Sequence, residues 1–141
     1  MAEDDPKDME LLREAIRRTD VPLQTRHVSD GQAVMDYLRG VEPFNDRARY
    51  PVPDVLLLDL KMPRVDGLQV LDWLRKHPKC SHIPTIMLSG SGLERDVNEA
   101  YRHGVRTYFA KPLEFSRLEE LVRLIATYWS TSERPTTPSQ Y

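Results

Sequence analysis

The sequence has few of the features that mark secreted, membrane-embedded or nucleic-acid-binding proteins. It contains one cysteine, Cys80, which cannot form an internal disulfide. Its apolar runs are only as long as a strand, so no membrane-spanning helix is predicted. The acidic start "MAEDD" lacks the basic and apolar segments of a secretory signal. Lys and Arg number 20 against 22 Asp and Glu, a formal charge of −2. No positive field therefore attracts nucleic acid or an anionic membrane, and we expect a cytoplasmic protein that binds neither.

The chain length fits one domain. Its 141 residues can bury a single core but are too few for two ordinary domains. We expect that domain to span residues 1–130. The remaining residues, 131–141, are polar and proline-rich, which predicts a disordered tail too short to hold a DNA-binding domain. Three prolines between 41 and 53 predict a surface loop.

Three apolar stretches predict buried strands, at 54–59, 83–89 and 106–110. Because the first two are apolar on both faces, they favour a parallel sheet covered by helices on each side. The alternating stretch 23–30 predicts a further strand. Apolar residues at helical spacing predict helices at 8–18, 30–40, 65–77, 92–104 and 113–129. Strands that alternate with helices indicate an α/β fold.

Polar side chains stand where the predicted strands end. Asp59 closes the run "DVLLLD", Ser89 closes "TIMLS", and Lys111 follows "TYFA". The carboxyl ends of parallel strands meet at one edge of the sheet, where sites form in open α/β folds. We therefore expect these three side chains to share that edge with Glu3 and Asp4 of "EDDP". Considered alone, Asp59 is more readily explained as a cap of the turn that follows it, and the other strand ends favour a site.

Acid, hydroxyl and amine together suit phosphoryl transfer. Crowded carboxylates repel one another unless a hard cation neutralises them, and Mg²⁺ prefers such ligands. A metal, a lysine and a hydroxyl can stabilise charge on the transferred group, and an aspartate nucleophile gives an acyl phosphate. The segment "EDDP" also has a structural interpretation, because Asp5 is a good N-cap and Pro6 suits the first helical position. The two interpretations are compatible.

These residues carry a family resemblance. The segments "LLLDLKMPRVDG", "IPTIMLSGSG" and "YFAKP", after "EDDP", resemble the receiver domain of two-component response regulators from Glu3 to about Trp129. The spacings from Asp59 to Ser89 and from Ser89 to Lys111 agree with that family. The resemblance implies a flavodoxin-like, doubly wound parallel sheet. Three further segments, "YPVPD", "AYRHG" and "ATYW", resemble stand-alone receivers found beside phytochrome-type histidine kinases.

The resemblance implies a phosphoacceptor and a set of metal ligands. Asp59 would accept the phosphoryl group and bind Mg²⁺. Asp4 would be a direct ligand, Glu3 a ligand through water, and Lys61 a ligand through its main-chain carbonyl.

It also implies residues that hold the phosphoryl group and pass on the signal. Ser89 would donate a hydrogen bond to the group, and Lys111, presented by a cis peptide bond to Pro112, would pair with it. Tyr108 would turn inward as a switch, with the face near Tyr101 as the output surface. On sequence alone, Tyr108 is equally an ordinary strand aromatic.

The expected function follows from that resemblance. The chain would be a receiver, not an enzyme, that accepts a phosphoryl group from a sensor histidine kinase, one of phytochrome type being a candidate, or from a phosphotransfer protein. One alternative is a pseudo-receiver that binds partners without being phosphorylated. Another is an Mg²⁺-dependent phosphohydrolase, which is disfavoured because Lys61 stands where such enzymes carry a second acid. Tyr128 and Trp129 could form a homodimer contact or pack in the core.

The sequence departs from this family at its start. Receivers open with a buried strand that runs into the acidic pair, and this chain begins "MAEDD", so we expect the first strand to be absent. In the flavodoxin-like order that strand lies mid-sheet, beside residues 54–59. Its absence would expose the edge of that stretch and the apolar faces of the helices. Burying about five side chains, at about 1.5–3 kcal/mol each, matches the stability of a whole domain. We therefore expect a segment upstream of Met1, or else weakened metal binding.

Overall fold

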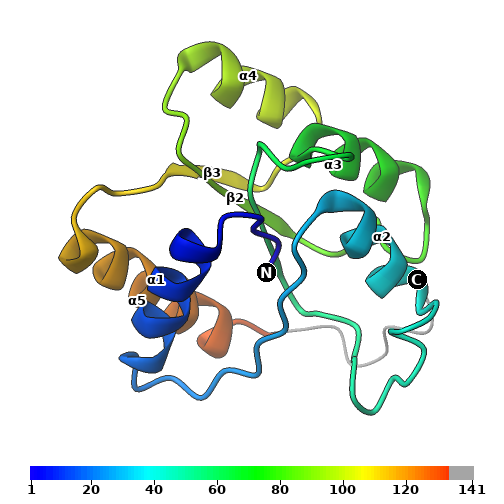
Figure 1. Cartoon of the computed structure of the whole chain (residues 1–141), viewed down its shortest axis with the longest axis horizontal. Coiled ribbons are helices and arrows are strands. Elements are labelled where there is room, and N and C mark those ends of the chain that lie inside the picture. The colour runs from blue at the N-terminus through cyan, green and yellow to red at the C-terminus, as the bar shows by residue number, and fades with distance from the viewer. Residues whose placement is uncertain (134–141) are drawn as a thin grey trace.

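The computed structural model describes residues 1–133, which form one α/β unit with a small parallel sheet between two layers of helices. In Figure 1, α2 and α3 lie on one side of the sheet and α1 and α5 on the other. The elements are α1 (Pro6–Arg17), α2 (Gly31–Arg39), β1 (Leu56–Leu58), α3 (Gly67–Lys76), β2 (Thr85–Ser89), α4 (Glu94–Arg102), β3 (Thr107–Ala110) and α5 (Phe115–Thr131). Of the predicted tail, residues 134–141 lie outside the described part, and α5 continues to Thr131.

The three predicted apolar strands form a parallel sheet in the order β1-β2-β3, as the fold class required. Leu58 pairs with Met87, and both are 0% exposed because helices cover both faces of the sheet. Ser89 pairs with Ala110, so β2 and β3 end side by side. Over the described residues, no helix combines the length and the apolar character needed to cross a membrane.

The starts of α1, α2 and α3 and the end of α2 follow cap residues of the sequence. Asp5 accepts hydrogen bonds from the backbone N–H groups of Lys7 and Asp8, which confirms its predicted capping role. Asp30 and Asp66 cap α2 and α3 in the same way. Gly40 ends α2 in the left-handed region at φ 69°, where a glycine has no steric penalty. Local chemistry therefore fixes where these elements begin and end.

The predicted strand over 23–30 is wrong. Only Val28 pairs with a neighbour, through an isolated bridge to Ala2, and Ala2 bridges Leu58 on its other side. A strand persists only when a continuous partner takes up its hydrogen bonds. Ala2 is a single residue between two segments, so the ladder stops after one bridge. As expected, no strand precedes α1 in the described residues.

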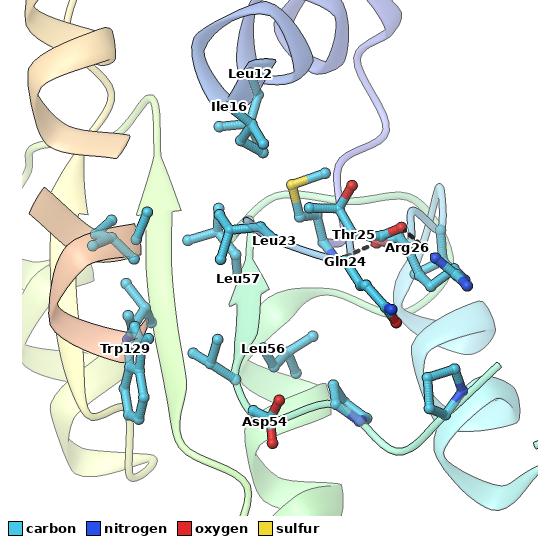
Figure 2. Close-up of a pocket in the computed structure, with 18 of the residues that line it drawn as sticks. Leu12, Ile16, Leu23, Gln24, Thr25, Arg26, Asp54, Leu56, Leu57 and Trp129 are labelled. Carbon is cyan, nitrogen blue, oxygen red and sulfur yellow. Dashed lines mark hydrogen bonds between the residues drawn. The ribbon is translucent and has the colours of Figure 1, made fainter. Parts of the chain in front are cut away.

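An apolar cavity of about 490 Å³ lies beside that bridge, and we call it the apolar slot. Figure 2 shows Leu12 and Ile16 of α1, Leu56 and Leu57 of β1 and Trp129 of α5 around it. Met1 also lines the slot, and burial lowers the pKa of its amino group to about 6. Apolar side chains of α2 on one side of the sheet and of α1 and α5 on the other thus line this cavity.

The two C-terminal aromatics are placed differently from each other. Trp129 lines the apolar slot, whereas the side of α5 that carries Tyr128 faces outward and leaves that residue 61% exposed. Their rings meet edge to face at 5.3 Å. Of the two sequence interpretations, packing against the interior describes Trp129, and a dimer contact through Tyr128 stays a prediction.

The proline-rich loop 41–53 is ordered by its own contacts. Tyr37 of α2 packs against Phe44 and Tyr50, with ring centroids 5.2 and 5.9 Å away. The Arg47 guanidinium donates to the carbonyls of Tyr37 and Leu38 at the end of α2. The Tyr37 carbonyl also accepts from the Gly40 N–H, whereas the Leu38 carbonyl lies in the last turn of α2, where helix carbonyls lack intrahelical donors.

Candidate functional site

The carboxyl edge of the sheet gathers the polar side chains that end the strands. Asp59 follows β1, Ser89 ends β2, and Lys111 follows β3. The Lys111 N–H donates to the Ser89 carbonyl at 2.7 Å, which joins the two strand ends. Asp59 and Ser89 are only 7% and 1% exposed, so both polar groups are held in a largely dry environment.

The Lys111 ammonium is the centre of a cluster of carboxylates. Its Nζ lies 2.5 Å from Glu3 Oε2, 3.0 Å from Asp8 Oδ2 and 3.3 Å from Asp59 Oδ2. The other Asp59 oxygen, Oδ1, accepts from the Leu60 N–H at 2.7 Å. The nucleophile candidate is therefore fixed by one backbone donor and one cation.

The electrostatics of the cluster reflect burial and crowding. Burial, together with the nearby charge of Asp59, raises the pKa of Glu3 to about 7, although the hydrogen bond from Lys111 works against this shift. Burial alone would lower the pKa of Lys111, but hydrogen bonds to Glu3 and Asp8 and the charge of Asp59 raise it above its ordinary value. Lys111 is therefore protonated, and it does not fully neutralise the acids around it.

Two of these acids, together with Asp4, form a donor set for a hard cation. Glu3, Asp4 and Asp59 each offer an oxygen, and the three atoms lie within 4.8 Å of one another. Asp4 is exposed, which leaves a side open to water. All-oxygen ligands with room for water match the preference of Mg²⁺, so the residues present fit a divalent cation.

The predicted switch residues form a second network beside the first. Ser89 Oγ accepts from the Ser91 N–H at 3.3 Å, and the Tyr108 hydroxyl donates to the Ser91 carbonyl at 2.6 Å. The Tyr108 N–H in turn donates to the Tyr101 hydroxyl at 3.3 Å. Ser91 Oγ also donates to Asp96 of α4. Hydrogen bonds thus connect the end of β2 to α4 and β3.

One expectation about the site is wrong, and another stays untested. The one cis peptide bond among residues 1–133 is Glu42–Pro43, so the expectation of a cis Lys111–Pro112 bond is wrong. With this trans peptide, Lys111 Nζ still contacts Glu3, Asp8 and Asp59. Lys61 is exposed two residues after Asp59, and the metal role implied for its carbonyl stays a prediction.

Sequence reasoning missed Asp8. It lies in the first turn of α1, where an acid is explained by the helix dipole alone. The available signal was its place in the helical turn that directly follows the acidic segment "EDD". The structure gives Asp8 a direct contact with Lys111.

These features define a class of α/β protein whose parallel sheet carries an acidic, lysine-centred site at its carboxyl edge, and comparison with known proteins identifies the family. The model of the response regulator receiver domain matches residues 1–123. The chain therefore belongs to the response regulator receiver family of two-component signalling. Response regulator Rcp1 of Synechocystis is 29% identical over 129 residues, which are 92% of this chain and 86% of Rcp1.

Solved structures of phytochrome-associated response regulators are similar throughout their length. RPA3017 of R. palustris, described in red light signalling, is 37% identical with a TM-score of 0.89 and 96% coverage of both chains. Phosphorylated RcpA, a cyanobacterial phytochrome response regulator, is 32% identical with a TM-score of 0.85, covering 96% of this chain and 95% of its own. The Mn²⁺-bound form of Rcp1 has a TM-score of 0.84, at 29% identity and 96% coverage of each chain. The subgroup resemblance seen in the sequence is confirmed.

Proposed function

We propose that this chain is a single-domain receiver that accepts a phosphoryl group on Asp59 in a Mg²⁺-dependent reaction. The observation that carries the proposal is the buried Asp59 carboxylate, 3.3 Å from Lys111 Nζ and beside two further acids. Phosphorylated RcpA and Mn²⁺-bound Rcp1 share this fold, which supports both the group and the metal.

The chemistry needs little beyond these side chains. An oxygen of Asp59 would form the new P–O bond while the P–N bond of a donor phosphohistidine breaks and its electron pair returns to the imidazole. Lys111 would stabilise the charge on the phosphoryl oxygens, and Ser89 would donate one hydrogen bond. A divalent cation held by Glu3, Asp4 and Asp59 would supply the remaining neutralisation.

The signal would leave through the second network. A phosphoryl group adds about 1.5 to 2 negative charges at Asp59. Drawing the Ser89 hydroxyl toward this group would remove its bond to Ser91, whose carbonyl holds Tyr108. The surface near Tyr108 and Tyr101 would then change conformation. Chemical-shift mapping with a phosphoryl mimic should show shifts there, and their absence would contradict this relay.

The donor would be a sensor histidine kinase or a phosphotransfer protein. The similarity to RcpA and RPA3017, whose descriptions name phytochrome and red light signalling, favours a kinase of phytochrome type. Incubation with candidate kinases and ATP, followed by phosphoprotein electrophoresis, would rank these donors.

Acetyl phosphate with Mg²⁺, followed by intact mass spectrometry, tests the central claim. We expect one phosphoryl adduct that is lost in Asp59→Asn and after chelation of the metal. Asp20→Asn, which removes an exposed acid outside the cluster, is the matched control and should keep the adduct. An inert wild-type chain would favour the pseudo-receiver, and continuous phosphate release would favour the phosphohydrolase.

A further inference from the structure

Asp8 is a third carboxylate on Lys111 that lies outside the candidate metal cluster. Its Oδ2 is 3.0 Å from Lys111 Nζ, closer than the 3.3 Å of Asp59 Oδ2. The acids that converge on a common cation position are Glu3, Asp4 and Asp59, without Asp8. The lysine therefore lies between the metal cluster and a separate acid.

The position of Asp8 is set by the start of α1. Its N–H donates to Asp5 Oδ1 at 3.2 Å as part of the helix cap. The Asp8 side chain is 40% exposed, whereas that of Lys111 is 17% exposed. A cavity of about 40 Å³ separates this turn from Pro112 and Leu118. The cap thus presents a half-hydrated carboxylate to a largely buried ammonium.

An ammonium group has three protons to donate, and three carboxylates already use them. A phosphoryl group on Asp59 must compete for these donors. The phosphoryl group must also approach the negative charge of Asp8, which is not one of the candidate metal ligands. Asp8 therefore opposes the movement of Lys111 toward the phosphoryl oxygens.

We propose that Asp8 is a positioning residue that restrains Lys111 and so weakens the hold of the site on its phosphoryl group. This inference rests on the proposed function. According to this proposal, the affinity of the site for the phosphoryl group depends on an acid that contacts neither that group nor the metal. Removing the charge while keeping the size of the side chain should strengthen binding.

Binding of beryllofluoride, a phosphoryl mimic, in the presence of Mg²⁺ tests the proposal by ¹⁹F NMR titration. Asp8→Asn should bind about two- to fivefold more tightly, the range expected for one partly exposed charge pair. Asp8→Glu, which restores the carboxylate, should return to the wild-type affinity. Glu10→Gln removes the same charge from an exposed position on α1 and should not differ from wild type.

A double-mutant cycle separates contact with Lys111 from a general field effect. In a Lys111→Met background, Asp8→Asn should leave the weakened affinity unchanged. An equal gain in both backgrounds would overturn the proposal, as would unchanged affinity of Asp8→Asn in a chain that does bind the mimic. Failure of the wild-type chain to bind the mimic at all would overturn the proposed function together with this inference. The two outcomes above would overturn the inference alone.

Discussion

The two ends of β1 differ sharply in how well their neighbours complete them. At the carboxyl end, Asp59 has a backbone donor, a lysine and two nearby acids. At the amino end, Leu56 and Leu57 face the apolar slot. Within the described residues, the one bridge on this edge of the sheet joins Ala2 to Leu58, the last residue of β1. The site needs a few side chains delivered from strand ends and a helix cap. The core beside it needs a continuous strand as a neighbour.

The largest expected contrast is between a filled and an unfilled part of the core. Leu58→Ala removes a fully buried side chain and should lower the free energy of unfolding by about 2–5 kcal/mol. Ile125→Ala removes a half-buried side chain that lines the slot, so it should cost only about 1 kcal/mol. Urea denaturation measures both. Equal losses would show that the slot is as well packed as the rest.

Filling the slot should remove the contrast. An N-terminal extension of five alternating Val and Ile residues can pair with β1 and bury side chains in both helix layers. Burial of each at about 1.5–3 kcal/mol, against an ordering cost of about 1–2 kcal/mol per residue, leaves a gain of a few kcal/mol. Thermal melts measure this gain. A Gly-Ser extension of equal length is the control, and equal melting temperatures would contradict the prediction.

At the carboxyl end of β1, the crowded acids should make the free energy of unfolding depend on pH. The pKa of Glu3 is raised from 4.5 to about 7, mainly by burial and the charge of Asp59. Between pH 4.5 and about 7, Glu3 therefore keeps its proton in the folded chain but has released it in the unfolded chain. Stability from this group is complete below pH 4.5 and is lost as pH rises through about 7.

Urea titrations in EDTA between pH 4.5 and 7.5 should show this decline, and Glu3→Gln should flatten it. Lys111, Asp59 and Asp4 face the same group, so the informative quantity is the difference between wild type and variant. Glu10→Gln should keep the wild-type slope. An identical slope in Glu3→Gln would contradict the raised pKa.

The smallest expected effect concerns the cap that places Asp8. Asp5→Ala removes the side-chain acceptor for two N–H groups and should cost about 1 kcal/mol of unfolding free energy. Asp5→Asn, which keeps an acceptor, should cost little. Chemical denaturation measures both, and a loss of equal size in the two variants would point to charge instead of the cap.

Much of the fold was predictable because its signals are local. The apolar runs at 54–59, 83–89 and 106–110 became β1, β2 and β3. Cap residues such as Asp5 and Gly40 marked helix ends, since their side-chain or backbone chemistry acts within one turn. The alternating stretch 23–30 also carried a local strand signal, but it had no continuous partner and stayed without regular structure apart from one bridge.

The candidate site was predictable to the extent that parallel strands end at one edge. That rule brought Asp59, Ser89 and Lys111 to the same end of the sheet. It did not identify Asp8, because its contact with Lys111 depends on how α1 packs beside the end of β3. Nor did it reveal that Ser89 Oγ bonds to the loop after β2, at Ser91.

The sequence by itself determined the order of the elements, the helix caps and the kinds of side chain at each strand end, because these depend on neighbours within a few residues. The tertiary structure alone decided which acids share the Lys111 ammonium and how much of the interior stays unfilled. Both depend on contacts between segments far apart in the chain, such as Asp8 with Lys111 and Ala2 with Leu58. Local propensity carries no information about such distances.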